Sequence, residues 1–253
     1  MTTDTRPKER AIETSFGASL GGIAKGAGMI APSLAPPPAT MIAVITTDAV
    51  VEPGPLAEAL SRAVTVSFNR ICVDNDTSTN DTVLCLANGQ AGGPTLAPGM
   101  AEYVEFEESL TQLCQGLAKD MVEDGEGATK FVEIVVEGAG SVADAEKVAR
   151  AVGQSQLCKT AFFGQDPNWG RIACAVGYAG VPFEPVALAI WLEDIQLVSK
   201  GAPTAYDEKE AAARMELAQF QIRIRIGEGA GSAVFWTTDL SHDYVTLNAH
   251  YRS

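Results

Sequence analysis

The chain has 253 residues, 46% hydrophobic and 20% charged, an ordinary composition for one sizeable globular domain or two small ones. Its formal net charge of -14 gives a surface that repels phosphate backbones and anionic lipids, which argues against binding nucleic acid or membranes. The five cysteines form no CxxC pair and only two histidines are present, which argues against a disulfide scaffold or a metal site. No apolar run approaches the ~20 residues that span a bilayer. We therefore expect a soluble, cytoplasmic protein with no metal and no cofactor.

The first forty residues are rich in glycine and end in a proline run. Five glycines lie within residues 17–28, and Pro36, Pro37 and Pro38 follow. Glycine adds backbone freedom, and consecutive prolines force an extended geometry without backbone donors. On composition alone, a flexible tail is one interpretation of this segment.

From residue 40 onward, strand and helix patterns alternate. In chain order the sequence first predicts a strand at 41–51, a helix entered at Pro53 with an apolar stripe from Leu56 to Ile71, a strand at 82–87 and a helix at 102–122. A strand at 131–136, a helix opened by Ser141, a strand at 188–198 and a helix capped by Asp207 come next. The last predicted elements are strands at 219–226 and 233–238 and a final helix from Ser241. The pattern predicts an α/β or α+β fold and does not order the strands.

Four polar clusters interrupt the apolar pattern, at residues 22–32, 39–41, 74–82 and 124–130. The glycine-rich segment around Lys25 does not match a phosphate-binding loop. The acidic residues of the third cluster lack the glycine and the final glutamate of a calcium-binding EF-hand, so a polar loop is the simpler interpretation. Glu126, between two glycines, is typical of a helix end followed by a turn. Taken singly, each cluster has an ordinary structural explanation.

Taken together and in this order, the clusters resemble the self-cleaving ornithine acetyltransferase (glutamate N-acetyltransferase) family of arginine biosynthesis. The shared motifs are KGAGMIAP, Ala-Thr-Met followed by ITTDA, DTSTNDT, GEGATK, KTAFFGQDPNWGRI and DLSHDYVTLNAHYRS. They extend over essentially the whole chain. The resemblance implies a sandwich of β-sheets flanked by helices.

Members of this family cleave themselves at an Ala-Thr bond into an α chain and a β chain. The resemblance implies that residues 1–39 are the C-terminal tail of the α chain, residues 40–253 the β-chain domain, and the assembly two α and two β chains. The new N-terminal threonine carries acetyl from N-acetylornithine to glutamate as an acetyl-threonine intermediate. A threonine hydroxyl needs a base to remove its proton, and the freed α-amine of the same residue can be that base.

The family's functional residues can be placed on matching positions of this chain. Thr40 is the implied nucleophile, and Ala39-Thr40 is the bond to be cleaved. The implied substrate contacts are Thr5, Lys25, Thr40, Glu126, Asn248 and Ser253. Lys25 suits a substrate carboxylate and Glu126 a substrate ammonium group, whereas Asn248 and Ser253 supply neutral donors and acceptors. Each of three residues also has an ordinary alternative: Lys25 as a solvated lysine, Glu126 as part of a turn, and Ser253 as the chain end.

The chain departs from the family pattern in two places. Most of the α chain, including the Thr-Gly pair of its oxyanion hole, has no counterpart here. We therefore expect this chain alone to have almost no acetyltransferase activity. Pro36 to Ala39 are interposed ahead of Thr40, so we expect slow cleavage because the stiff run lies next to the bond. A self-cleaving aminopeptidase-type hydrolase and an inactive truncated subunit are the alternative functions. Bifunctional members also use acetyl-CoA as an acetyl donor, and the sequence leaves that use open for this chain.

Overall fold

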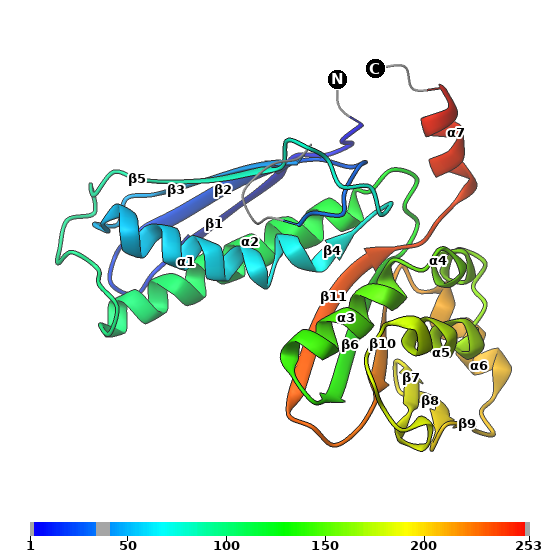
Figure 1. Cartoon of the computed structure of the whole chain (residues 1–253). Coiled ribbons are helices and arrows are strands. Elements are labelled where there is room, and N and C mark those ends of the chain that lie inside the picture. Colours follow the sequence, from blue (N-terminus) through cyan, green and yellow to red (C-terminus); the bar gives the residue numbers. More distant parts are fainter. Residues whose placement is uncertain (1–2, 34–40, 251–253) are drawn as a thin grey trace. The chain divides into compact units, whose positions relative to one another are not determined.

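The computed structural model describes residues 3–33 and 41–250, and the chain divides into two compact units (Figure 1). The first unit is Met1–Ile71 with Asn75–Gly125, and the second is Cys72–Asp74 with Glu126–Ser253. Each unit has its own sheet and its own helices. The predicted division after residue 39 concerns covalent chains rather than compact units, and it stays a prediction.

The first unit is a four-stranded sheet in the order β1-β2-β3-β5, covered by helices. Its elements are β1 (Lys8–Glu13), β2 (Ser19–Lys25), β3 (Ile42–Thr47), α1 (Pro53–Thr65), the short 3-10 helix η1 (Phe68–Arg70), β5 (Thr82–Ala87) and α2 (Ala101–Glu123). β2 pairs antiparallel with both β1 and β3, whereas β3 and β5 run parallel. Helices α1 and α2 lie along one face of this sheet (Figure 1), where Leu20, Ile45 and Leu117 form part of a fully buried core.

Strands β1 and β2 lie in the segment for which composition allowed a flexible tail, and that alternative does not hold for the described residues. The glycines serve close packing instead. A Cβ atom added at Gly22 would lie 2.9 Å from Leu117 Cδ1 and 3.2 Å from Leu113 Cδ2. Gly22 therefore lets helix α2 pack directly on strand β2.

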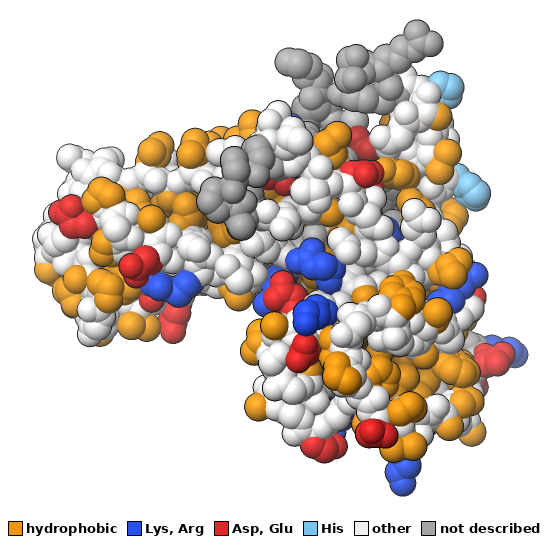
Figure 2. Space-filling view, viewed as in Figure 1, with side chains coloured by type: hydrophobic (Ala, Val, Ile, Leu, Met, Phe, Trp, Pro, Cys, Tyr) orange, Lys and Arg blue, Asp and Glu red, His pale blue; other side chains and the backbone are white. Residues whose placement is uncertain are grey.

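The other face of this sheet carries exposed apolar side chains. Ile23, Val44 and Leu84 form one row across three strands, because Ile23 pairs with Val44 and Val44 pairs with Leu84. Ile23 and Leu84 are 58% and 48% exposed, and Ile42 and Leu86 in the neighbouring rows are 45% and 58% exposed. Hydrophobic side chains lie along the upper edge of this unit in Figure 2, where its strands run in Figure 1. We call this surface the open sheet face.

The second unit is built on a seven-stranded sheet in the order β4-β11-β6-β10-β7-β8-β9. Its strands are β4 (Ile71–Cys72), β6 (Phe131–Ala139), β7 (Ala189–Leu192), β8 (Ile195–Ser199), β9 (Ala202–Pro203), β10 (Gln219–Arg225) and β11 (Gly231–Thr238). Its helices are α3 (Val142–Gly153), α4 (Gln156–Phe163), α5 (Trp169–Tyr178), the 3-10 helix η2 (Pro185–Ala187), α6 (Glu208–Glu216) and α7 (His242–His250). Strands β6 and β10 run parallel at the centre, and Ile134, Ile222 and Ile224 are almost fully buried there.

The single strand predicted at 188–198 is instead the antiparallel hairpin β7–β8. The chain turns at Glu193, which has a φ of 52°. A left-handed glutamate is unusual, and the turn has no glycine or proline to announce it in the sequence. Helices α4 and α5 were also not predicted, although Ser155 and Asn168 cap them with side-chain hydrogen bonds.

The predicted fold class is confirmed, because both units are sheets flanked by helices. None of the helices in the described part of the chain is both long enough and apolar enough to cross a membrane. On the face drawn in Figure 2, basic side chains lie beside acidic ones rather than gathering in a basic patch.

Candidate functional site

One end of the first unit's sheet brings together the residues around the predicted nucleophile. Lys25 ends strand β2 and pairs with Ile42, and Ile42 pairs with Thr82 at the start of β5. The three residues form a cross-strand row at this end. Lys25, a predicted substrate contact, is partly exposed there. Ala39 and Thr40 lie outside the described residues, as does Ser253.

The residue that follows Thr40 is held on both sides of its backbone. The Met41 N–H donates a hydrogen bond to Asp81 Oδ1, and the Met41 carbonyl accepts one from the Thr82 N–H at 2.9 Å. Met41 is fully buried and Asp81 is 5% exposed. Asp81 lies in the DTSTNDT motif, but its role was not predicted because its partner is a backbone group. An acidic residue directly before an apolar strand was the only signal.

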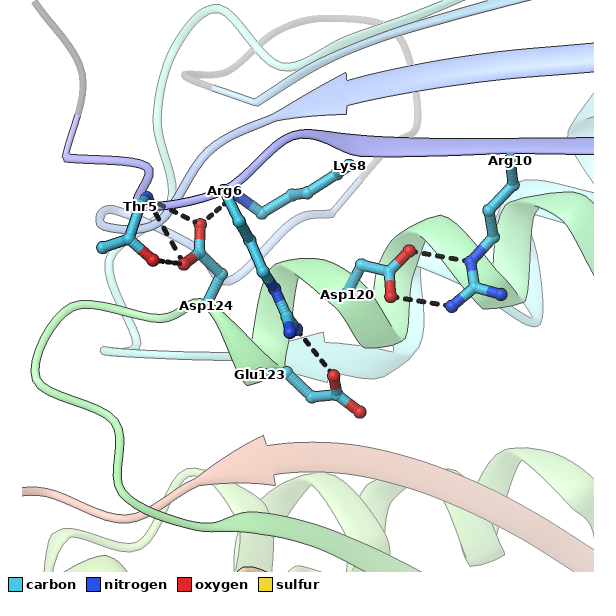
Figure 3. Close-up of polar contacts among 7 residues, drawn as sticks. All are labelled: Thr5, Arg6, Lys8, Arg10, Asp120, Glu123 and Asp124. Carbon is cyan, nitrogen blue, oxygen red and sulfur yellow. Dashed lines mark hydrogen bonds and ion pairs between the residues drawn. The ribbon is translucent and has the colours of Figure 1, made fainter.

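Thr5, another predicted substrate contact, is fixed by Asp124 at the C-terminal end of α2 (Figure 3). The Thr5 N–H lies 3.1 Å from Asp124 Oδ2, and the Thr5 hydroxyl donates to Asp124 Oδ1. Lys8, whose side chain is fully buried, bridges Asp124 and Asp4. The Thr5 hydroxyl proton is thereby committed, while its oxygen can still accept a hydrogen bond.

The Asp124 carboxylate stays ionised in this setting. Burial alone would raise its pKa, but the hydrogen bonds from Lys8 and Thr5 outweigh burial and lower the pKa of Asp124. A buried carboxylate with a lysine and two threonine donors is a rigid anchor rather than a proton donor. Asp124 therefore fixes the backbone that carries Thr5.

In the second unit, the structure brings Glu126 and Asn248 together. Asn248 Nδ2 donates to Glu126 Oε2 at 2.8 Å, across 122 positions of sequence. The same amide nitrogen donates to the Tyr244 carbonyl at 3.1 Å, which orients it along helix α7. A partly exposed carboxylate beside an exposed amide can bind an ammonium group and a neutral polar group of one small ligand.

Gly127 allows this approach. Its φ is 66°, and a Cβ atom there would lie 2.4 Å from the Tyr244 nitrogen. The Ser241 hydroxyl donates to the Gly127 carbonyl at 2.6 Å. The loop that carries Glu126 is therefore held against the start of α7 by the Ser241 side chain, at a close approach that only glycine permits.

Three of the motifs meet through Asp239 and Lys159. Asp239 Oδ1 accepts the backbone N–H groups of Thr129 and Lys130 at 2.8 and 3.0 Å. Lys159, 1% exposed, donates to Thr237 Oγ1 at 3.0 Å and to the Thr238 carbonyl. Burial lowers the pKa of Lys159 to about 8. Asp239 therefore holds the segment that follows Glu126, a role that its sequence position does not reveal.

Comparison with known proteins places the whole chain in one family. Residues 1–253 match the model described as the ArgJ family. The chain is 46% identical over 256 residues to the arginine biosynthesis bifunctional protein ArgJ of Symbiobacterium thermophilum, covering 100% of this chain and 63% of that protein. It is 47% identical over 257 residues to the ArgJ protein of Geobacter sulfurreducens, covering 100% and 64%.

A chloroplastic relative and a solved structure agree. The chloroplastic ArgJ protein of Physcomitrium patens is 48% identical over 259 residues, covering 99% of this chain and 49% of that protein. The crystal structure of the arginine biosynthesis bifunctional protein argJ from Bacillus halodurans superimposes with a TM-score of 0.79 at 40% identity, covering 81% of this chain and 97% of that one. The chain thus spans less than two thirds of the length of these curated relatives.

Proposed function

Because the chain belongs to the ArgJ family, we propose that it forms the acetyl-transferring part of a glutamate N-acetyltransferase in arginine biosynthesis. In this proposal, Thr40 takes acetyl from N-acetylornithine and passes it to glutamate, with no cofactor. The active protein contains two α and two β chains and works in the cytoplasm. Acetyl-CoA is the alternative acetyl donor.

The observation that carries the proposal is the cross-strand row of Lys25, Ile42 and Thr82. Ile42 is two residues after Thr40 in the sequence, so the partly exposed Lys25 pairs with the segment that follows the proposed nucleophile. A lysine ammonium is a point charge suited to the carboxylate that both amino-acid substrates carry. An apolar partner at this position would leave that carboxylate unpaired.

The proposed chemistry has two matched halves. The Thr40 hydroxyl attacks the acetyl carbonyl of N-acetylornithine while its proton passes to the Thr40 α-amine. The C–N bond then breaks, and ornithine leaves with that proton on its amine. The glutamate amine attacks the acetyl ester, and its proton returns through the α-amine to the Thr40 oxygen. An α-amine with an ordinary pKa of about 8 is matched to such transfers near neutral pH.

The other proposed contacts orient the substrate. Glu126 pairs with the side-chain ammonium of N-acetylornithine, and Asn248 offers its amide beside it. Thr5 offers a hydroxyl oxygen that Asp124 holds in place. Ser253 is assigned as a contact from the sequence alone.

Self-cleavage creates the nucleophile in this proposal. The Thr40 hydroxyl attacks the Ala39 carbonyl, the amide becomes an ester, and water hydrolyses the ester to give the Ala39 carboxylate and the free Thr40 amine.

The test measures N-acetylglutamate by mass spectrometry after mixing N-acetylornithine with glutamate. The chain is assayed alone and co-expressed with the N-terminal part of a relative, because the relatives are longer. We expect transfer in the co-expressed sample, its loss in Thr40→Ala, and intact mass showing that Thr40→Ala is not cut at residue 39. Transfer that survives Thr40→Ala would disprove the assignment, and release of N-terminal residues from peptides would favour the hydrolase.

A further inference from the structure

We propose that Asp81 is the positioning residue of Thr40, and that it acts by holding the peptide group that joins Thr40 to Met41. The inference rests on the proposed function, in that it takes Thr40 as the nucleophile. It adds a residue that the family resemblance did not assign. Asp81 touches no substrate in this proposal, and its effect passes through the backbone.

Covalent geometry makes the contact close to the nucleophile. The Met41 nitrogen, which donates to Asp81 Oδ1, is bonded directly to the carbonyl carbon of Thr40. That bond belongs to a planar peptide group, so Asp81 holds the chain one covalent bond from the proposed nucleophile.

Two consecutive residues hold Met41, namely Asp81 just before β5 and Thr82 at its start. Asp81 accepts its N–H through a side chain, and Thr82 donates to its carbonyl through the backbone. The ordinary parallel ladder of β3 and β5 begins only after this point, since Ile42 is the first residue of β3. The Asp81 side chain thus extends the ladder by one hydrogen bond toward Thr40.

Burial makes this contact stiff. Asp81 is 5% exposed and Met41 is not exposed at all, so water does not compete freely for the hydrogen bond. Lys25 pairs with Ile42, the residue after Met41. The held Met41 backbone and the proposed carboxylate-binding lysine therefore lie at the same end of one sheet.

Positioning of this kind affects rate rather than binding. Reacting atoms must lie within about 3–3.5 Å, and a misplacement of about 1 Å can cost ~10²-fold in rate. Self-cleavage and acetyl transfer both use the Thr40 hydroxyl, so both depend on this peptide. Substrate affinity depends on other side chains and is unaffected.

The test compares Asp81→Ala, Asp81→Asn and a matched control, Asp48→Ala, in the chain co-expressed with a relative's N-terminal part. Asp48 follows the opposite end of β3 and accepts the Ser19 N–H at 2.7 Å. We expect Asp81→Ala to slow cleavage at residue 39 and to lower kcat by ~10²-fold with KM unchanged. Asp81→Asn retains an acceptor oxygen and restores most of both rates, and Asp48→Ala behaves as the parent protein.

Hydrogen exchange of the Met41 amide gives a second readout that does not depend on activity. Asp81→Ala should lose protection at this amide, whereas Asp48→Ala should keep it. If Asp81→Ala does not fold, Asp81→Ser replaces it in the test. The serine side chain is polar but one atom shorter, so its hydroxyl does not reach the Met41 N–H.

The outcomes separate the two proposals. If the parent protein neither cleaves nor transfers acetyl, the proposed function fails, and the role of Asp81 falls with it. If the parent protein is active and Asp81→Ala cleaves and turns over like the control, the role of Asp81 alone is overturned. Asp81→Asn being as slow as Asp81→Ala would also overturn it, since the acceptor oxygen would then not be what matters.

Discussion

A single hydrogen bond joins Glu126 to Asn248, two residues that the sequence placed at opposite ends of the second unit. The same amide nitrogen also donates to the Tyr244 carbonyl, and the Asn248 carbonyl oxygen is a neutral acceptor. The pair therefore presents both a negative charge and a neutral acceptor. In the proposed function, this combination suits a substrate that carries an ammonium group.

Replacing Glu126 by glutamine tests that assignment. Glu126→Gln keeps the size and one acceptor oxygen, replaces the other oxygen by an NH2 donor, and removes the charge. We expect KM for N-acetylornithine to rise ~30-fold or more with a smaller change in kcat, since losing one partner of a desolvated charge pair costs ~2–5 kcal/mol. Steady-state kinetics of the co-expressed protein measure it.

The matched control is Glu123→Gln, which removes a carboxylate paired with Arg6 at 2.6 Å on the surface. Such pairs contribute about 1 kcal/mol or less, and KM should not move. An unchanged KM in Glu126→Gln together with a lower melting temperature would mean that Glu126 serves only the turn.

At the scale of elements, two acidic residues, Asp120 within helix α2 and Asp124 at its end, clamp strand β1 (Figure 3). Arg10 binds Asp120 through two hydrogen bonds of 2.7 Å, and Lys8 binds Asp124. Residues four apart lie on the same side of a helix, so one helix face holds the whole strand. The clamp fixes the start of β1, and with it Thr5.

Asp124→Asn should destabilise the first unit in a pH-dependent way. The pKa of Asp124 is lowered in the folded state, so its contribution is complete above the unfolded pKa near 4 and is lost as pH falls through the lower folded pKa. We expect a loss of about 3 kcal/mol at pH 7, the low end for a broken buried pair because Asp4 still binds Lys8. The difference from the parent protein should shrink below about pH 4.

Denaturant unfolding at pH 7 and at pH 3 measures this effect. Asp120→Asn is the control on the same helix, and its exposed partner Arg10 limits the loss to about 1 kcal/mol. Equal losses for the two variants at pH 7 would show that the burial of Lys8 and Asp124 gives their pair no advantage.

Gly127→Ala should disturb the contact between the Glu126 loop and helix α7. The new Cβ would lie 2.4 Å from the Tyr244 nitrogen, so the helix that carries Asn248 must shift. We expect KM for N-acetylornithine to rise by about 10-fold, in addition to a strain of about 1 kcal/mol from the positive φ.

Gly180→Ala separates strain from displacement. Gly180 has a φ of 73° and no atom within 4 Å of an added Cβ. It should show the same strain in unfolding experiments and an unchanged KM. If both variants raise KM equally, the close approach of Gly127 to α7 does not position the site.

At the scale of the molecule, local signals predicted much of the fold. The strand at 82–87 and the helix at 102–122 agree with β5 and α2 to within one residue, because each has a clear period and a clear end. Ser141 and Asp207 cap α3 and α6 as predicted. Strands β1 and β2 were missed because their glycines suggested flexibility, when Gly22 in fact admits Leu117.

Non-local contacts set the limit for the site. The types of Lys25 and Glu126 suggested their proposed ligands, but only the register of β2 and β3 places Lys25 beside the residues that follow Thr40. Asp81 could not be predicted as a support, because its partner is the backbone of Met41, 40 positions away. Side-chain chemistry is visible in a sequence, whereas strand pairing is not.

The open sheet face gives the molecule a property that can be measured without substrate. Its exposed apolar residues lie in adjacent rows on strands β2, β3 and β5, so they form one patch rather than scattered side chains. Patches of more than a few hundred Å² are uncommon on monomeric proteins, and apolar dyes bind to them.

We expect the double variant Leu84→Thr and Leu86→Thr to reduce dye fluorescence several-fold. Threonine favours strands, so the free energy of unfolding should change by less than about 0.5 kcal/mol per site. Val186→Thr is the control, since Val186 is 71% exposed in the second unit and belongs to no such row. Equal dye binding by the parent protein and the double variant would mean that the rows do not act as one apolar surface.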